Sequence, residues 1–96
     1  MSETERLEKE NEILRMRNDG CNSDIIERHE ALIETLRFRS EGEPFTAKWA
    51  SWVLKISGYA VKGLLRHCAR MGLLDISTIR VEMNTGTSLY TWRVSE

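Results

Sequence analysis

The 96-residue sequence predicts a mainly α-helical fold that ends in a C-terminal β-hairpin. Apolar residues recur at three- and four-residue steps in successive stretches before Leu74, and side chains that can cap a helix precede several of these stretches. After them, residues 79–83 and 90–94 alternate apolar and polar residues on either side of a turn-forming segment, Asn84 to Thr87, so the hairpin strands are expected from Ile79 and up to Val94. The expected order is therefore helices first and a hairpin last.

The first helix is expected from Glu3 to Arg17, which contains no glycine or proline and is rich in good helix formers. Steps of four and three residues, typical of the a and d positions of a coiled coil, connect Leu7, Asn11, Leu14 and Asn18. This spacing favours a parallel homodimer. It covers only about two heptads, however, so a packed or frayed helix is the alternative. In either case residues 1–20 are predicted to be an N-terminal helical extension.

Turn-forming residues separate the next helices. Asn18–Asp19–Gly20 is a helix breaker, and Asn22 or Ser23 can cap a second helix from Asp24 to about Arg39. Its apolar stripe consists of Ile25, Ile26, His29, Leu32, Ile33 and Leu36.

A loop ending at Pro44 precedes Thr46, which can cap a third helix. In this helix we expect Trp49 and Trp52 to anchor the core, because tryptophan buries a large apolar area. The outward-facing side is expected to carry Lys48, Ser51 and Lys55.

A fourth helix is expected between Ser57, a good N-cap, and Gly72, which suits the left-handed turn that ends a helix. Its apolar side consists of Val61, Leu64, Leu65, Cys68 and Gly72. The opposite side holds three cations and no carboxylate, and consists of Tyr59, Lys62, Gly63, Arg66 and Arg70. A solvated helix face usually mixes both signs of charge, so this stripe indicates contact with a polyanion, although an ordinary surface face is the alternative.

The charge distribution supports the same interpretation. Residues 1–44 carry seven cations against twelve carboxylates, a net charge of −5, whereas residues 45–96 carry seven cations against three carboxylates, a net charge of +4. This asymmetry favours a polyanion-binding module joined to a segment with another role. Cys21 and Cys68 lack metal-ligand spacing with the two histidines, and no catalytic motif is present. We therefore expect a soluble, cytoplasmic binding protein that has no cofactor or metal and is not an enzyme.

From Asp24 onward the order of elements resembles the winged helix-turn-helix family of DNA-binding domains. The resemblance rests on Leu54–Lys55–Ile56–Ser57, on Val61, Leu65 and Cys68 at the family's core spacings, on Gly72–Leu73–Leu74 after the recognition helix, and on the hairpin as the wing. It covers about three quarters of the chain. Residues 21–96 would form this domain, with residues 57–71 as a recognition helix in the major groove of double-stranded DNA.

The resemblance also implies which residues contact DNA. The groove-facing set is Gly58, Tyr59, Ala60, Lys62, Gly63 and Arg66, with Arg70 nearer the backbone. Phosphate contacts are implied for Thr46, Lys48 and Ser51. Lys55 replaces the glycine usual in the turn, where we expect only a tolerable backbone, and adds a charge. The wing tip lacks Lys and Arg, so its base is the better candidate, at Arg80 or Arg93.

The expected function is sequence-specific binding of double-stranded DNA for transcriptional regulation, by a homodimer on a palindromic site. The alternative is a protein-interaction module that uses the same fold, because fold alone does not determine function. Its contacts would come from the acidic helices or from the hairpin aromatics Tyr90 and Trp92.

Overall fold

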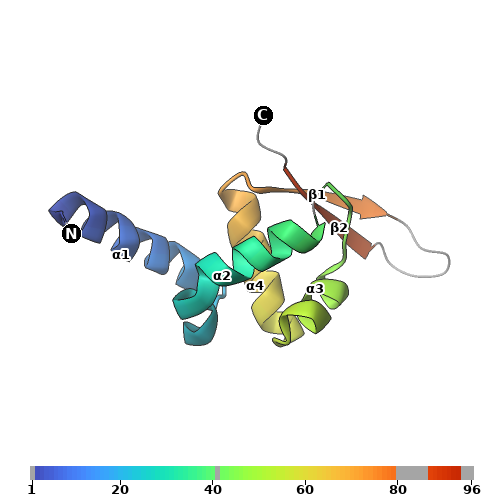
Figure 1. Cartoon of the computed structure of the whole chain (residues 1–96), viewed down its shortest axis with the longest axis horizontal. Coiled ribbons are helices and arrows are strands. Elements are labelled where there is room, and N and C mark those ends of the chain that lie inside the picture. Colours follow the sequence, from blue (N-terminus) through green and yellow to red (C-terminus); the bar gives the residue numbers. More distant parts are fainter. Residues whose placement is uncertain (1, 41, 80–86, 94–96) are drawn as a thin grey trace.

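The computed structural model describes residues 2–40, 42–79 and 87–93, and in this part of the chain it contains four helices and a two-stranded antiparallel sheet. The elements are α1 (Glu3–Asn18), α2 (Ser23–Ser40), α3 (Ala47–Leu54), α4 (Gly58–Arg70), β1 (Leu74–Ile79) and β2 (Thr87–Trp92). Figure 1 shows α2, α3 and α4 gathered into a body, with α1 projecting on one side and the hairpin on the other. The prediction of a mainly helical fold with a C-terminal hairpin is confirmed. None of the described helices has the length and apolar character needed to cross a membrane.

The helices begin where the sequence supplies a cap. The amide of Ala60 donates to Ser57 Oγ at 3.1 Å, and the amide of Trp49 donates to Thr46 Oγ1 at 3.2 Å. Gly72, with φ of 78°, takes the left-handed conformation after α4. The predicted caps of α3 and α4 and the glycine after α4 are confirmed.

The hairpin starts earlier than the alternating pattern suggested. β1 begins at Leu74 and not at Ile79, and Leu74 lies opposite Trp92 in the antiparallel register. Both side chains are buried, so the strand starts where the chain can fill the core beside α4. Residues 84–86 of the predicted turn and residues 80–83 of the predicted alternation lie outside the described residues, and Thr87, predicted to end the turn, is the first residue of β2.

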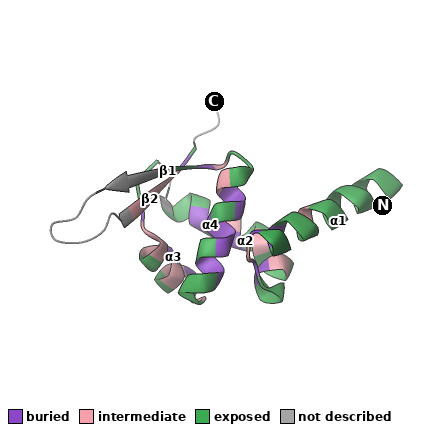
Figure 2. Ribbon diagram, turned by 180° about the vertical axis from the view of Figure 1, so that it is seen from behind, coloured by how far each residue is buried: buried purple, intermediate pink, exposed green. Residues whose placement is uncertain are grey.

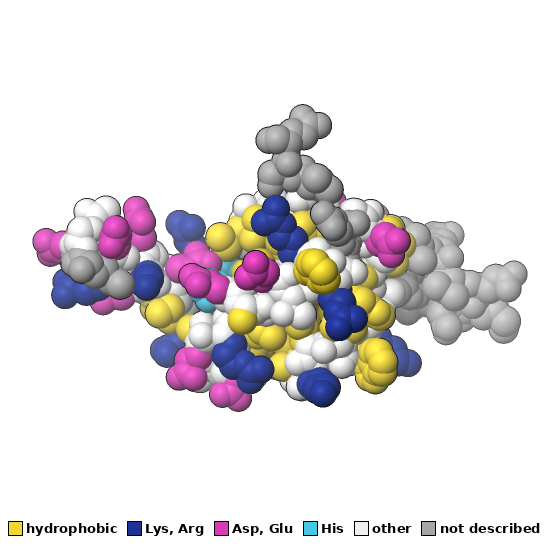
Figure 3. All heavy atoms as spheres, viewed as in Figure 1, with side chains coloured by type: hydrophobic (Ala, Val, Ile, Leu, Met, Phe, Trp, Pro, Cys, Tyr) yellow, Lys and Arg dark blue, Asp and Glu magenta, His cyan; other side chains and the backbone are white. Residues whose placement is uncertain are grey.

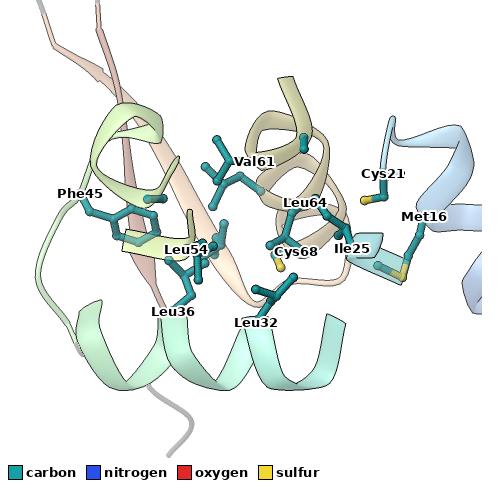
Figure 4. Close-up of a cluster of buried hydrophobic side chains, with 14 of the residues drawn as sticks. Met16, Cys21, Ile25, Leu32, Leu36, Phe45, Leu54, Val61, Leu64 and Cys68 are labelled. Atoms are coloured by element: carbon teal, nitrogen blue, oxygen red, sulfur yellow. The ribbon is translucent and has the colours of Figure 1, made fainter. Parts of the chain in front are cut away.

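The core forms between α2, α4 and the hairpin (Figure 4). As predicted, α4 contributes Val61, Leu64, Leu65 and Cys68, all fully buried. The same core continues to Met16 and Cys21, which Figure 4 places beyond Ile25 at the end nearest α1. The last turn of α1 is therefore part of the body, whereas residues 2–11 are exposed.

The prediction that Trp52 anchors the core is wrong. Its side chain is 80% exposed, while Trp49 is half-buried and packs against Phe45 with ring centroids 5.5 Å apart. The side of α3 that faces the core carries Ala50 and Leu54, both buried. These two residues are four apart and lie on one side of the helix, so the adjacent position of Trp52 faces solvent.

Candidate nucleic-acid interface

The exposed side of α4 carries a basic stripe. Tyr59 is 79% exposed, and Lys62 and Arg66 follow it at steps of three and four residues on the same side of the helix. Figure 2, seen from behind, shows exposed and buried residues alternating along α4. Neither Lys62 nor Arg66 forms an ion pair within the described part of the chain. Their charges are therefore available to a ligand.

Two residues that the resemblance assigned to the DNA-facing side are buried. Ala60 is almost fully buried, and Gly63 packs against the turn that joins α1 to α2. A Cβ atom at Gly63 would lie 2.7 Å from both the carbonyl carbon and the carbonyl oxygen of Gly20. The burial of Ala60 and Gly63 contradicts their assignment to a DNA contact, and the turn after α1 covers Gly63.

A buried polar cluster joins the end of α1 to α4. His67, which is 1% exposed, has Nδ1 at 3.0 Å from Asp19 Oδ2 and Nε2 at 2.6 Å from Glu12 Oε1. A ring protonated on both nitrogens donates to both carboxylates. The Arg70 guanidinium also donates to Asp19. The charge of Arg70, which the resemblance placed near the DNA backbone, is thus already balanced within the protein.

Asp19 is the centre of this cluster. Burial alone would raise the pKa of its carboxyl group, but hydrogen bonds from Arg70 and His67 outweigh burial and hold that pKa below its usual value. The Asp19 side chain therefore stays ionised at neutral pH, and it connects two residues of α4 to the turn after α1. No local pattern in the sequence marks this cluster, because its two acids lie between 48 and 55 positions before the residues of α4 that they contact.

The exposed side of α3 carries a lysine, a tryptophan and a lysine in succession. Lys48 and Trp52 are exposed on α3, and Lys55 is exposed directly after the helix. Lys55 has φ of 56° and ψ of 44°, in the left-handed region. The turn thus requires more of Lys55 than the tolerable backbone that the sequence led us to expect, because this conformation favours glycine. Trp52 is four residues after Lys48, so helical spacing places the two on the same exposed side. The apolar character of tryptophan favoured the core and hid this signal in the sequence.

The other predicted phosphate contacts of α3 bind the protein's own backbone. Thr46 Oγ1 caps α3, and the Ser51 hydroxyl donates to the carbonyl of Ile56 at 2.6 Å across the turn before α4. Both side chains are half-buried. Their hydroxyl groups therefore shape the turn, and Lys48 and Lys55 are left as the exposed cations of this region.

At the base of the hairpin, Arg93 is paired. Its Nε and Nη2 atoms donate to Asp75 Oδ1 at 2.8 and 2.6 Å. This pairing lowers the pKa of the Asp75 carboxyl group and raises the pKa of Arg93. Arg93 is thus a weaker candidate for DNA contact than the sequence indicated, and Arg80 lies outside the described residues.

The predicted dimerisation residues lie on the exposed surface of α1. Leu7, Asn11, Leu14 and Asn18 are all exposed. Their spacing places them on one side of α1, and Met16 and Asp19 attach the end of the helix to the body. The homodimer stays a prediction, with its residues accessible to a second copy.

The described residues contain no cluster of histidine, cysteine and carboxylate side chains suited to a metal ion. Cys21 and Cys68 are free and buried. Burial raises the pKa of Cys21 to about 11 and that of Cys68 to about 12, with smaller contributions from neighbouring acids. Thiols held in this protonated state are poor nucleophiles and serve as core residues.

Comparison with protein-family models, with curated proteins and with solved structures found no match. Functional inference for this chain therefore depends on the side chains that α3 and α4 expose. Apart from Arg70, which is paired with Asp19, the exposed residues of this surface are Lys48, Trp52, Lys55, Gly58, Tyr59, Lys62 and Arg66. They combine four cations with two aromatic rings and include no carboxylate, a composition suited to nucleic acid.

Proposed function

We propose that the protein binds double-stranded DNA sequence-specifically, as a transcriptional regulator, by placing α4 in the major groove. The observation that carries the proposal is the carboxylate-free exposed stripe of Tyr59, Lys62 and Arg66, whose charges are free while the opposite side of the helix is buried. The major groove of B-DNA is wide enough to admit an α-helix. A helix held rigidly by its core side can present these three side chains to base edges.

The chemistry of each residue defines its role in this complex. Arg66 or Lys62 donates hydrogen bonds to the N7 and O6 acceptors of guanine, and Tyr59 packs on a sugar or a thymine methyl group. Lys48 and Lys55 neutralise phosphates, which adds affinity without sequence preference. Arg70 and Arg93 are already paired with carboxylates, so fewer residues are available to contact DNA than the sequence suggested.

Two copies joined through α1 would present two such helices. The exposure of Leu7 and Leu14 supports this arrangement, because an isolated helix has little reason to keep leucines in solvent at coiled-coil spacing. The DNA site would then be a palindrome with half-sites about one helical turn apart.

The test begins with selection of a target from a pool of random duplexes by the full chain. Fluorescence anisotropy then gives the affinity for the target and for random duplex across a salt series. Arg66→Ala should reduce the preference for the target by about 1–3 kcal/mol. Lys55→Ala should weaken both duplexes equally and lower the salt slope by about one.

Lys9→Ala, an exposed cation on α1, serves as the matched control and should leave both affinities unchanged. Equal losses on target and random duplex for Arg66→Ala would refute the role of α4 in reading sequence. No binding of any duplex at low salt would refute DNA binding itself.

The alternative function, a protein-interaction module, was expected to use Tyr90 and Trp92 of the hairpin as contacts, and the structure leaves these two side chains little surface for a partner. Trp92 is 5% exposed, and the half-buried ring of Tyr90 stacks on Phe45 with ring centroids 5.9 Å apart. Both aromatic residues are thus engaged inside the protein. This alternative would regain support only from an absence of duplex binding in the salt series.

A further inference from the structure

Trp52 stands between two hollows on the surface of α3. One hollow, of about 560 Å³, is lined by Arg39, Ser51, Trp52, Val53 and Lys55. The other, of about 500 Å³, is lined by Thr46, Lys48, Trp49, Ser51 and Trp52. An indole that is 80% exposed and borders a hollow in each direction has ring surface open to a flat ligand.

Cations border both hollows. Arg39 and Lys55 line the first, Lys48 lines the second, and no carboxylate appears among the described residues that line either one. Arg39, Lys48 and Lys55 form no ion pair within the described part of the chain. Figure 3 shows Lys and Arg side chains beside hydrophobic side chains over this part of the body. The surface therefore offers positive charge next to an open aromatic ring.

The backbone at Lys55 is a separate indication of function. Lysine occupies a left-handed position, at φ of 56°, where glycine would be unstrained. Strained backbone of this kind tends to occur at functional sites. A lysine kept at such a position supplies a cation to the first hollow that a glycine could not supply.

We propose that Arg39, Lys48, Trp52 and Lys55 form a binding site for single-stranded nucleic acid. One or two unpaired bases stack on the indole of Trp52, and the adjacent phosphates lie against the three cations. Stacking is tolerant of sequence, because every base has a π face, and a positively charged groove beside an aromatic ring is the usual arrangement for binding a single strand.

The chemistry distinguishes this ligand from two others. Bases within a duplex are stacked on each other and offer no free face to Trp52, so duplex DNA uses only the cations of this surface. An apolar protein partner would meet cations on both sides of the indole. The site goes beyond the proposed duplex contact of α4: it shares Lys48 and Lys55 with that contact, and Trp52 and Arg39 are its own.

The experiment measures binding of the full chain to a fluorescein-labelled thymidine oligonucleotide of about 12 nucleotides by anisotropy at low salt. Trp52→Ala should weaken binding about tenfold for each base that stacks. Trp52→Phe should retain most of the affinity, because a phenyl ring also stacks. Phe38→Ala is the matched control, since Phe38 is an equally exposed aromatic residue, at 80%, and should not alter the affinity.

Tryptophan fluorescence provides the second readout. Oligonucleotide binding should quench the emission of the wild type and not that of Trp52→Phe, because Trp49 and Trp92 are partly or fully buried. Unchanged affinity in Trp52→Ala, or no oligonucleotide binding by the wild type, would overturn the proposal. Arg66→Ala should weaken target duplex and leave the oligonucleotide unaffected, so failure of the duplex function is distinguishable from failure of this site.

Discussion

Replacing Gly63 by alanine is expected to destabilise the protein, although alanine is the better helix former by about 1 kcal/mol. The added Cβ would lie 2.7 Å from two backbone atoms of Gly20 and 3.0 Å from the carbonyl oxygen of Asp19. All three are backbone atoms, so no side-chain rotation relieves the overlap. Overpacking of this kind typically costs about 1–3 kcal/mol. Relief by moving α1 away from α4 would stretch the hydrogen bond between Asp19 and His67.

Gly58→Ala is the control, because a Cβ at Gly58 meets no atom within 4 Å and lies on the same helix. We expect this variant to be as stable as the wild type or slightly more stable. The two variants should differ by about 2 kcal/mol, which corresponds to melting temperatures about 10 °C apart for a domain of this size. Thermal unfolding followed by far-UV circular dichroism measures this. A Gly63→Ala variant at least as stable as Gly58→Ala would show that the turn after α1 does not pack on α4.

Three other predictions follow from local features. Glycine adopts the left-handed backbone at position 55 without strain, so Lys55→Gly should be more stable than Lys55→Ala by about 0.5–1 kcal/mol, which raises the melting temperature by a few degrees. Both variants should weaken duplex binding alike, and equal melting temperatures would contradict the strain. Asp19 has a lowered pKa in the folded chain, so its stabilising contribution is complete above its unfolded pKa of about 3.8 and is lost as the pH falls through the lower folded value. Asp19→Asn should therefore lower the free energy of unfolding by about 3 kcal/mol at neutral pH, and this free energy should then fall less steeply in acid than it does in the wild type. An equally steep fall in acid would argue against the cluster. Cys21 and Cys68 should react with a thiol reagent at pH 8 only as fast as the protein unfolds, and rapid reaction in the folded state would contradict their burial.

The features that sequence predicted well are those that depend on neighbouring residues. Thr46 and Ser57 cap their helices through hydrogen bonds to amides three residues away, so a short window contains the whole interaction. The apolar side of α4 followed from helical periodicity, and Leu64 and Cys68 are buried as that periodicity required.

The features that sequence did not predict depend on distant contacts. The two ring nitrogens of the buried His67 lie within hydrogen-bond distance of Asp19 and Glu12, 48 and 55 positions away, and no local pattern marks that pairing. Gly63 lies on the basic side of α4 by spacing, but the turn at Gly20 covers it. The side chain of Trp52 was assigned to the core by its apolar character, whereas the packing of α3 is decided by the smaller residues on its other side.

The central claim is that the exposed sides of α4 and α3 meet duplex DNA, and chemical-shift mapping tests it most directly. Random duplex is titrated at low salt into the full ¹⁵N-labelled chain, and amide shifts are followed residue by residue. We expect the largest changes at Gly58, Tyr59, Lys62 and Arg66, with smaller ones at Lys48, and almost none along residues 3–14. Changes concentrated on α1, or no changes at all, would contradict it.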